Sequence, residues 1–534
     1  MTGPKRQAET EGRHAARRAP DAPVVLVALE PASGRPLHRQ VYDGLRDAIL
    51  AGRLPPGARL PSTRALAADL GVARNTVTLA FDQLRAEGYV TGARGGGTRV
   101  RSAVPDALLG LRAGGAASAS RAEARRAGER PREVRVSARA AALAAAGATI
   151  VRRGVTPPVP FRIGVPALDA FPARLWARLT ARRWRRGGVR LGDADPAGER
   201  ALREAIAAYV ANARGARCTP DQVVVVSGTQ QALDLAARVL LDPGDAAWVE
   251  DPGYIGAHAP LAAAGARLVP VPVDDQGLDV PAGERAAPRA RLAYVTPSHQ
   301  FPLGAVMSAP RRLALLAWAR RADAWVVEDD YDSEFRYTGR PLPCLQGLDE
   351  ERRAPGEQAR VVYVGTFSKS LAPGLRLGYL ILPEELVDAV RAVRAATDRH
   401  SSTLEQGVLA DFLGEGHYAR HVRRVRALYA ERQEMLLAAA ADELDDRLSL
   451  TPDPAGLHLV GWLPPGVRDG AVSRAALAEG VEAVALSRFT LARGEGSRAA
   501  ARGALLLSYA AFRGEEIRAG VRRLRRALDA AVPR

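Results

Sequence analysis

Hydrophobic positions along the chain follow two different patterns. In Pro36–Ala51, the apolar residues Leu37, Val41, Leu45 and Ile49 are four positions apart, which predicts one buried face of a helix. From about residue 158 onward, short apolar runs alternate with amphipathic helical segments up to the C-terminus. That alternation is typical of an α/β domain with a largely parallel sheet, so we expect this fold class for most of the chain.

These patterns divide the 534 residues into four parts. Residues 1–35 are polar and rich in Arg and Ala, which predicts a mobile tail. Residues 36–103 are compactly patterned, and residues 104–157 form an Ala-, Arg- and Gly-rich stretch that we interpret as a linker. Residues 158–534 are the α/β domain, of which about 405–534 is expected to be a smaller C-terminal part.

The order of elements in residues 36–103 predicts a winged helix-turn-helix. A second helix is expected after the candidate N-cap Ser62 and ends at Gly71, and a third helix follows directly. In such a unit the N-terminal residues of the third helix enter the major groove of DNA. The predicted elements are helices Pro36–Ala51, Thr63–Leu70 and Val72–Glu87 and strands Gly88–Gly92 and Thr98–Ser102.

The distribution of charge favours an anionic partner for this module. The formal net charge is +17, from 76 Lys and Arg against 59 Asp and Glu, and residues 1–153 hold 26 of the basic residues against 13 acidic ones. A basic excess confined to one end of a chain is typical of contact with a polyanion. A solvated helix face is the alternative interpretation for these charges, and an ordinary hairpin turn for the glycines.

The sequence LPSTRALAADLGVARNTVTLAFDQLRAEGYV, followed by a Gly-rich hairpin, resembles the GntR-type winged helix-turn-helix. The resemblance implies binding to a double-stranded DNA operator. It also implies which residues contact the DNA: Arg64, Arg74, Asn75 and Thr76, with Gly95 and Gly96 at the tip of the wing.

One lysine is conspicuous by composition. Only Lys5 and Lys369 are lysines among the 76 basic residues. An imine requires an amine that can lose its proton, and arginine cannot supply one at working pH. Lys369 is therefore a candidate for covalent chemistry, with a surface lysine as the alternative.

Several classes of protein are disfavoured by composition. Cys218 and Cys344 are too few for a disulfide framework or a Cys-rich zinc site, and we expect no metal. No stretch approaches 18 apolar residues, and the N-terminal segment lacks the apolar core of a secretory signal. We therefore expect a cytoplasmic protein without membrane contact.

Candidate chemistry in the α/β domain follows predicted strands. Each feature has an ordinary alternative, such as a common βα turn, a helix cap, a core tyrosine or a structural histidine. Together, at the strand ends of an open sheet where ligands bind, they suit pyridoxal phosphate, which needs an imine lysine, a carboxylate for its ring nitrogen, a ring-stacking group and phosphate donors. The candidates are Ser227, Gly228 and Thr229 after Val223–Val226, with a helix expected over Gln230–Leu241; Tyr254; His299 after Leu292–Val295; Asp329 and Tyr331 after Trp325–Glu328; and Thr366, Ser368, Lys369 and Arg376 after Val361–Val364.

The phrases SGTQQALDL, EDPGY, TPSHQFPLG, EDDYDSEFRY and GTFSKSLAPGLRLGY resemble the fold-type I aminotransferases. Combined with the N-terminal module, they resemble the MocR/GabR-type regulators, a subgroup of the GntR family. The resemblance implies a Schiff base on Lys369, Asp329 at the pyridine nitrogen, Tyr331 at the ring hydroxyl with His299 as a second neighbour, and Tyr254 stacked on the ring. It implies that Ser227, Gly228, Thr229, Thr366, Ser368 and Arg376 surround the phosphate.

The chain departs from the family pattern at three positions. Asp193 stands where the family often has a tyrosine that reaches the cofactor phosphate of the partner subunit. Ala511 and Gly256 stand where the regulator specific for γ-aminobutyrate has arginines, and Arg513 is near Ala511 but shifted. We therefore expect an effector other than γ-aminobutyrate gripped in that way, and poor transamination of ordinary α-amino acids.

The sequence thus predicts a homodimeric, pyridoxal-phosphate-dependent transcriptional regulator. Its aminotransferase-like domain would sense an amine or amino-acid effector, or the cofactor itself, through a Lys369 aldimine. Two alternatives stay open: a working aminotransferase with a DNA-binding appendage, and a binding protein that reports the level of the cofactor alone.

Overall fold

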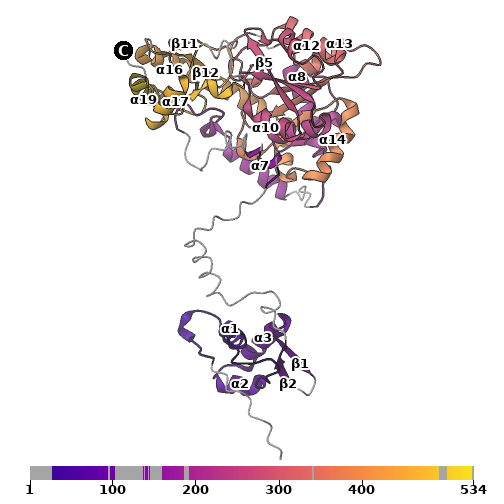
Figure 1. Cartoon of the computed structure of the whole chain (residues 1–534), viewed down its shortest axis with the longest axis vertical. Coiled ribbons are helices and arrows are strands. Elements are labelled where there is room, and N and C mark those ends of the chain that lie inside the picture. The colour runs from indigo at the N-terminus through magenta and orange to yellow at the C-terminus, as the bar shows by residue number, and fades with distance from the viewer. Residues whose placement is uncertain are drawn as a thin grey trace, which may run out of the picture. The chain divides into compact units, whose positions relative to one another are not determined.

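A computed structural model describes residues 27–93, 97–102, 136–137, 139–141, 143–144, 159–185, 192–339, 342–444, 446–491 and 502–531. The chain separates into two compact units, Met1–Arg135 and Val136–Arg534 (Figure 1). The glycines Gly95 and Gly96 and most of the predicted linker lie outside the described residues.

Among its described residues, the first unit contains three α-helices and a two-stranded antiparallel hairpin. Their apolar faces meet in one core, in which Leu45, Val77 and Leu84 are fully buried. Ser62 caps the second helix by accepting a hydrogen bond from the Ala65 N–H, as expected. The elements are α1 Leu37–Leu50, α2 Thr63–Asp69, α3 Arg74–Ala86, β1 Val90–Ala93 and β2 Gly97–Val100.

Packing of this unit extends further toward the N-terminus than the predicted boundary at residue 36. Val27 is only 9% exposed and belongs to the same core. It lies against Gly44 of α1, where a Cβ would come within 2.6 Å of Val27 Cγ1. The expected mobile tail, residues 1–35, therefore includes residues held against α1: Val27 and Leu29 pack on the core, and the Glu30 N–H donates to Gln40 Oε1.

The second unit is built on an eight-stranded sheet with helices on both faces. The strand order is β3-β10-β9-β8-β7-β4-β5-β6, and β9, β8, β7, β4 and β5 run parallel. The expectation of a largely parallel sheet is confirmed, with β10 antiparallel to both of its neighbours. The strands are β3 Val223–Val226, β4 Ala246–Asp251, β5 Arg267–Asp274, β6 Gly277–Leu278, β7 Leu292–Val295, β8 Trp325–Asp330, β9 Val361–Thr366 and β10 Gly378–Ile381.

Burial on both faces explains why these strands are continuous apolar runs rather than alternating ones. In β3, Val224 and Val226 pack on one side and Val223 and Val225 on the other. One face of the sheet is covered by α9 Thr229–Leu240, α10 Ile255–Ala263 and α14 Glu384–Thr397. The other face is covered by α7 Ala173–Arg185, α8 Arg200–Arg214, α11 Val280–Ala286, α12 Ala309–Arg321, α13 Leu345–Arg352 and α15 Thr403–Gly414.

The C-terminal part forms a smaller subdomain beside this sheet (Figure 1). It has a four-stranded antiparallel sheet in the order β11-β12-β14-β13 and a separate core that includes Leu436, Leu505 and Leu524. Its elements are α16 His417–Leu444, β11 Ser449–Leu450, β12 His458–Trp462, α17 Asp469–Ala478, β13 Val484–Ala485, β14 Ala504–Ser508 and α19 Gly514–Ala531. None of the described helices is both long and apolar enough to span a bilayer.

Candidate functional site

The candidate residues gather at one edge of the large sheet because the strands that carry them end there. In the parallel part, β4, β7, β8 and β9 all present their carboxyl ends at this edge. Antiparallel β10 begins at the same edge, with Gly378 paired to Val226 of β3 and to Thr366 of β9. The structure therefore brings the residues after β3, β4, β7, β8 and β9 together, as the sequence predicts.

Asp329 is a buried carboxylate with only one of its oxygens bonded. It lies within β8, which is two residues longer than the predicted strand Trp325–Glu328. Oδ2 accepts a hydrogen bond from the Tyr294 hydroxyl at 2.8 Å, and Oδ1 is buried without a hydrogen-bond partner among the described residues. Burial raises the pKa of Asp329 to about 7, against the opposing effects of the Tyr294 bond and of Lys369. A buried cationic N–H donor at Oδ1 would satisfy this group.

Lys369 follows β9 and is partly buried. Its Nζ donates to the Gly164 carbonyl at 2.8 Å. Burial lowers its pKa below the ordinary lysine value, although the charges of Asp329 and Asp332 act in the opposite direction. Loss of the proton is what a lysine needs to act as a nucleophile, so the surroundings of Lys369 favour its reactive form.

The turn between β3 and α9 forms a cradle of backbone and cationic groups. Gly228 has φ of +109°, a conformation that favours glycine, and it precedes Thr229 at the first turn of α9. A Cβ at Gly228 would lie 3.4 Å from both Nη1 and Nη2 of Arg376, so the guanidinium packs against this turn. Arg376 itself adopts the left-handed region with φ of +52°, a strained conformation that clusters at functional sites.

The hydroxyl groups of the site lie on either side of that cradle. The Ser227 Oγ lies 3.1 Å from the Ser401 Oγ, and Thr366 Oγ1 accepts from the Ser368 N–H at 3.1 Å. Gly378, at the start of β10, lies so close to the β3–α9 turn that a Cβ on it would be 3.0 Å from Gly228 Cα. Backbone N–H groups at a helix start, hydroxyls and an arginine together make a site for an anion such as phosphate.

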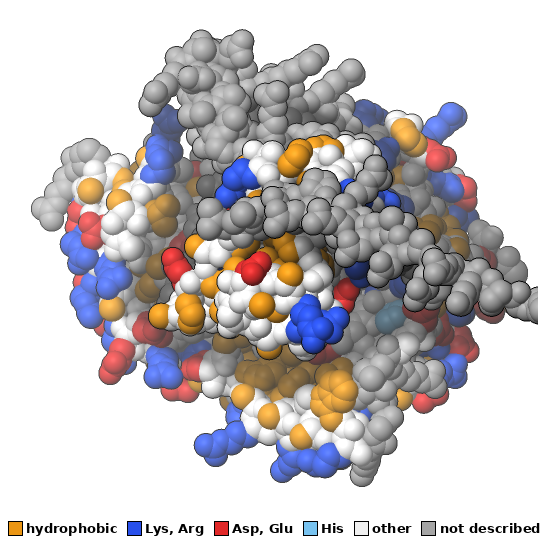
Figure 2. Space-filling model, turned by 90° about the horizontal axis from the view of Figure 1, so that it is seen from below, with side chains coloured by type: hydrophobic (Ala, Val, Ile, Leu, Met, Phe, Trp, Pro, Cys, Tyr) orange, Lys and Arg blue, Asp and Glu red, His pale blue; other side chains and the backbone are white. Residues whose placement is uncertain are grey.

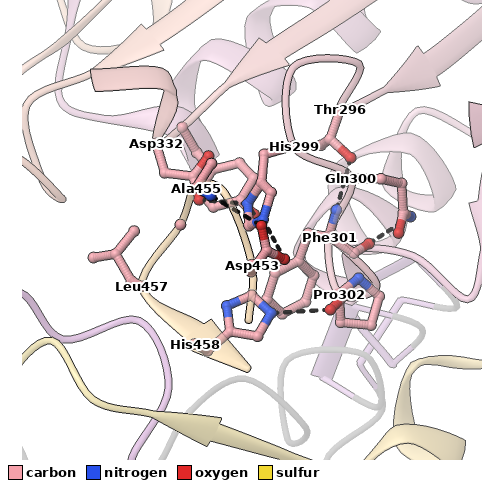
Figure 3. Close-up of polar contacts among 12 residues, drawn as sticks. Thr296, His299, Gln300, Phe301, Pro302, Asp332, Asp453, Ala455, Leu457 and His458 are labelled. Carbon is pink, nitrogen blue, oxygen red and sulfur yellow. Dashed lines mark hydrogen bonds and ion pairs between the residues drawn. The ribbon is translucent and has the colours of Figure 1, made fainter. Parts of the chain in front are cut away.

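His299 lies between two carboxylates from different parts of the unit (Figure 3). Its Nδ1 is 2.8 Å from Asp332 Oδ2, and its Nε2 is 3.3 Å from Asp453 Oδ2 in the C-terminal subdomain. Burial alone lowers the pKa of His299, but the two carboxylates outweigh burial and raise the pKa to about 10. The ring is therefore an imidazolium that donates from both nitrogens, and Nδ1 also lies 3.1 Å from the Tyr331 hydroxyl oxygen.

Tyr254 follows β4 and is partly buried beside an aromatic group. Its ring meets Phe301 edge to face at a centroid distance of 5.9 Å, and its hydroxyl accepts from Gln230 Nε2 at 3.3 Å. Burial raises its pKa to about 12, so the phenol stays protonated. A Cβ at Gly256 would lie 2.2 Å from Tyr254 Cζ, so this orientation of the ring depends on glycine two residues later.

The structure also shows the surroundings of Asp193 and Ala511, the other two positions at which the chain departs from the family pattern. Asp193 is exposed and pairs with Arg399 at 3.1 Å. Ala511 packs on the core of the C-terminal subdomain, and Arg513 is 75% exposed, with Nε 3.7 Å from Asp169 Oδ2. Asp193 and Arg513 thus both lie at the surface of the chain described.

In the first unit, the predicted DNA-contacting residues surround the start of α3. Arg64, Arg74 and Asn75 are exposed and Thr76 is partly buried. The Arg74 Nε donates to Thr63 Oγ1 at 3.3 Å, which links α3 to α2. Figure 2 shows one face of the molecule, on which the Lys and Arg side chains of the described residues are interspersed with Asp and Glu.

Sequence reasoning missed several residues of the site. Tyr294 lies inside a predicted strand, Ser401 follows α14, and Asp453 lies in a loop of the C-terminal subdomain. Their partners are separated from them in sequence by 35 residues for Tyr294, 174 for Ser401 and 154 for Asp453. No local pattern could have found them.

Comparisons with known proteins agree with this architecture. Residues 37–100 match the family described as bacterial regulatory proteins, gntR family, and residues 167–524 match aminotransferase class I and II. The chain is 42% identical over 87% of its length to the probable rhizopine catabolism regulatory protein MocR of Rhizobium meliloti, of which 89% is covered. The chain belongs to the MocR-type, GntR-family transcriptional regulators.

Further relatives of this regulator include both transcription factors and enzymes. It is 41% identical to the HTH-type transcriptional regulator TauR of Rhodobacter capsulatus, over 79% of this chain and 83% of TauR. The structure of LysN, the α-aminoadipate aminotransferase of Thermus thermophilus in complex with N-(5'-phosphopyridoxyl)-L-leucine, matches with a TM-score of 0.62 and 34% identity, covering 70% of this chain and 92% of LysN. The fold-type I aminotransferase fold is thereby confirmed, and it implies use of pyridoxal phosphate.

Proposed function

We propose that this regulator holds pyridoxal phosphate through an imine bond to Lys369 and changes its action on DNA when an amine or amino-acid effector, or the cofactor itself, alters the occupancy of that site. The observation that carries the proposal is Asp329. A buried carboxylate with an unbonded Oδ1 and a pKa raised to about 7 needs a cationic N–H partner, which a protonated pyridine nitrogen supplies.

The chemistry that the cofactor supplies is withdrawal of electrons from the carbon that carries the imine nitrogen. The protein's part is to hold protons and orient groups. Asp329 would keep a proton on the ring nitrogen, and Tyr331 would donate to the ring hydroxyl, with His299 beside Tyr331. Tyr254 covers the ring, as its partly buried position beside Phe301 favours.

The phosphate is assigned to the cradle at the start of α9. Ser227, Gly228 and Thr229 would offer their hydroxyls and backbone N–H groups, and Thr366 and Ser368 would face them from the end of β9. Arg376 supplies the counter-charge, since its guanidinium already packs against Gly228.

The first unit would read an operator in double-stranded DNA. Arg64, Arg74, Asn75 and Thr76 are proposed to contact it, with Gly95 and Gly96 at the wing tip. We expect a homodimer, because the aminotransferase-like unit is of a dimeric type, and therefore an operator with repeated or palindromic half-sites. With Asp193 in place of the family tyrosine, the contact with the cofactor site of the partner subunit is expected to be weaker.

A working aminotransferase is the second candidate function. It is favoured by 36% identity, over 69% of this chain, to a protein named 2-aminoadipate transaminase from Thermus thermophilus, of which 89% is covered. A third possibility, sensing of the cofactor alone, is favoured by 33% identity over 82% of this chain to the HTH-type pyridoxine biosynthesis transcriptional regulator PdxR of Corynebacterium glutamicum, of which 85% is covered.

The visible absorption spectrum of the purified full-length protein tests these functions. We expect a band from the lysine-bound cofactor that shifts reversibly with one amine from a panel. Conversion to the aminated cofactor that a keto acid resets would favour the enzyme. No shift with any amine, but a DNA affinity that changes with pyridoxal phosphate, would favour the cofactor sensor. A protein that stays colourless with added pyridoxal phosphate would refute the proposal.

A further inference from the structure

Ser227 belongs to a closed ring of polar contacts that joins the start of α9 to the end of α14. Its backbone N–H donates to Gln231 Oε1 at 2.6 Å, and Gln231 Nε2 donates to Asp398 Oδ2 at 2.5 Å. Asp398 Oδ1 lies 3.3 Å from Arg394 Nε. Arg394 Nη2 donates to Ser401 Oγ at 2.8 Å, and Ser401 Oγ lies 3.1 Å from Ser227 Oγ, which closes the ring.

Arg394 is an unusual member of this ring because its charge is fully buried. Its side chain is 0% exposed, whereas that of its ionic partner Asp398 is 37% exposed. Nη1 has no hydrogen-bond acceptor within the described residues, and Nε has the ion pair with Asp398 but no hydrogen bond of good geometry. A guanidinium stays protonated even when it is buried, and a buried charge with so few partners is costly. The Asp398 carboxylate offsets part of that cost, and a further anion close to this group would offset more.

One donor in the ring is fixed by chemistry. A guanidinium can only donate, so the Ser401 oxygen accepts from Arg394. Between Ser401 and Ser227 either hydroxyl can donate, and when Ser401 donates, the Ser227 proton is free to point out of the ring. Hydrogen bonds in such a chain strengthen one another, and a charged first donor polarises the whole series. In the arrangement in which Ser401 donates, the Ser227 hydroxyl is oriented to donate beside Gly228 and the first turn of α9.

We infer that Arg394 is a positioning residue for the phosphate group of bound pyridoxal phosphate, acting through Ser401 to make the Ser227 hydroxyl a phosphate donor. The inference rests on the proposed function and adds a residue from outside the cradle itself. The rival interpretation is a structural clasp that only fastens α9 to α14.

The test compares two ligands that differ by the phosphate alone. Full-length protein freed of cofactor is titrated with pyridoxal phosphate and with pyridoxal, and binding is followed by visible absorbance. For Ser401→Ala we expect a Kd for pyridoxal phosphate about tenfold higher and an unchanged Kd for pyridoxal, because a hydrogen bond to a charged group contributes about that much. Arg394→Met is expected to change the same ratio in the same direction.

Thr397→Ala is the matched control, since this hydroxyl also lies at the end of α14 but bonds to the Val393 and Arg394 carbonyls instead of the ring. It should leave both Kd values unchanged. Equal weakening of pyridoxal phosphate and pyridoxal in Ser401→Ala would make the ring a structural clasp and overturn the inference. If Ser401→Ala left both Kd values unchanged, the inference would be overturned too, and this result does not depend on whether Arg394→Met folds. If the unmodified protein binds neither ligand, the proposed function itself fails.

Discussion

Replacing His299 should change how the stability of the aminotransferase-like unit depends on pH. The ring is buried between Asp332 and Asp453, and these carboxylates outweigh the effect of burial and raise its pKa from an ordinary 6.5 to about 10. Raising the pKa to about 10 corresponds to about 5 kcal/mol of stabilisation of the folded state by the protonated ring. The full contribution is present below pH 6.5 and is lost as the pH rises toward 10, because the unfolded chain releases the proton first.

Between pH 7 and pH 9 this single group should remove about 2–3 kcal/mol from the free energy of unfolding. In His299→Gln that pH-dependent contribution is absent, so the stability difference between the unmodified protein and the variant should be about 2–3 kcal/mol larger at pH 7 than at pH 9. Urea unfolding of cofactor-free protein, followed by tryptophan fluorescence, measures the difference. All six tryptophans lie between Trp176 and Trp462, within the unit Val136–Arg534, so the signal reports on that unit alone.

His258→Gln is the control for this experiment. Burial lowers the pKa of His258 to about 4, so the folded protein holds it neutral throughout the range. Its removal should change the pH dependence above pH 7 by well under about 1 kcal/mol, and with the opposite sign. If the stability gap between the unmodified protein and His299→Gln were the same at pH 7, 8 and 9, the ring would not be an imidazolium and the reasoning would be wrong.

Three further substitutions test other parts of the molecule. Lys369→Ala should abolish the covalent linkage that borohydride reduces, as checked by the mass of the reduced protein; an adduct that persists would refute the assignment. Arg74→Ala should weaken operator binding by about 1–3 kcal/mol if the side chain reads a base edge, measured by titration with labelled duplexes, and equal weakening on random DNA would make it a phosphate contact instead. Gly256→Ala should cost about 1–3 kcal/mol of stability in urea unfolding, because its Cβ would lie 2.2 Å from Tyr254 Cζ, and no loss would mean that the ring has room to move.

The sequence predicts most of the second unit's architecture because its strands are buried on both faces. Runs such as Val223–Val226 cannot be exposed on either side, which is a strong signal for a covered sheet. The position of β10 is not predictable in this way. Gly378–Ile381 is another apolar run, and nothing local indicates that it lies antiparallel between β3 and β9.

The limits of strand prediction also have a physical cause at β8. The predicted strand ends at Glu328 because two aspartates follow, and charged residues usually mark a strand end. Asp330 instead stays in the strand, since Arg214 and the Tyr363 hydroxyl both bond its Oδ2 at 2.6 Å. Tertiary partners of this kind reverse a local preference, and they cannot be inferred from the sequence of one segment.

The segment before the first helix illustrates the same limit. Residues 1–35 are expected to be mobile because most of them are polar, but Val27 fills the space that Gly44 leaves open on α1. The sequence around a glycine on a helix face does not indicate which side chain packs against it.

The balance between sensing and turnover depends on how the site would grip an amino acid's carboxylate. Gly256 leaves room for the Tyr254 ring, so an arginine at that position would have to displace the ring. Ala511 is part of an apolar core, and the nearby buried Arg432 is occupied by the Ala510 carbonyl and Asp169. Arg513, by contrast, has an exposed guanidinium in this region of the described chain. We therefore propose that, if the site holds pyridoxal phosphate as proposed, it recognises the amine of an effector rather than rapidly exchanging amino acids, which suits a regulator that must keep its effector bound rather than convert it.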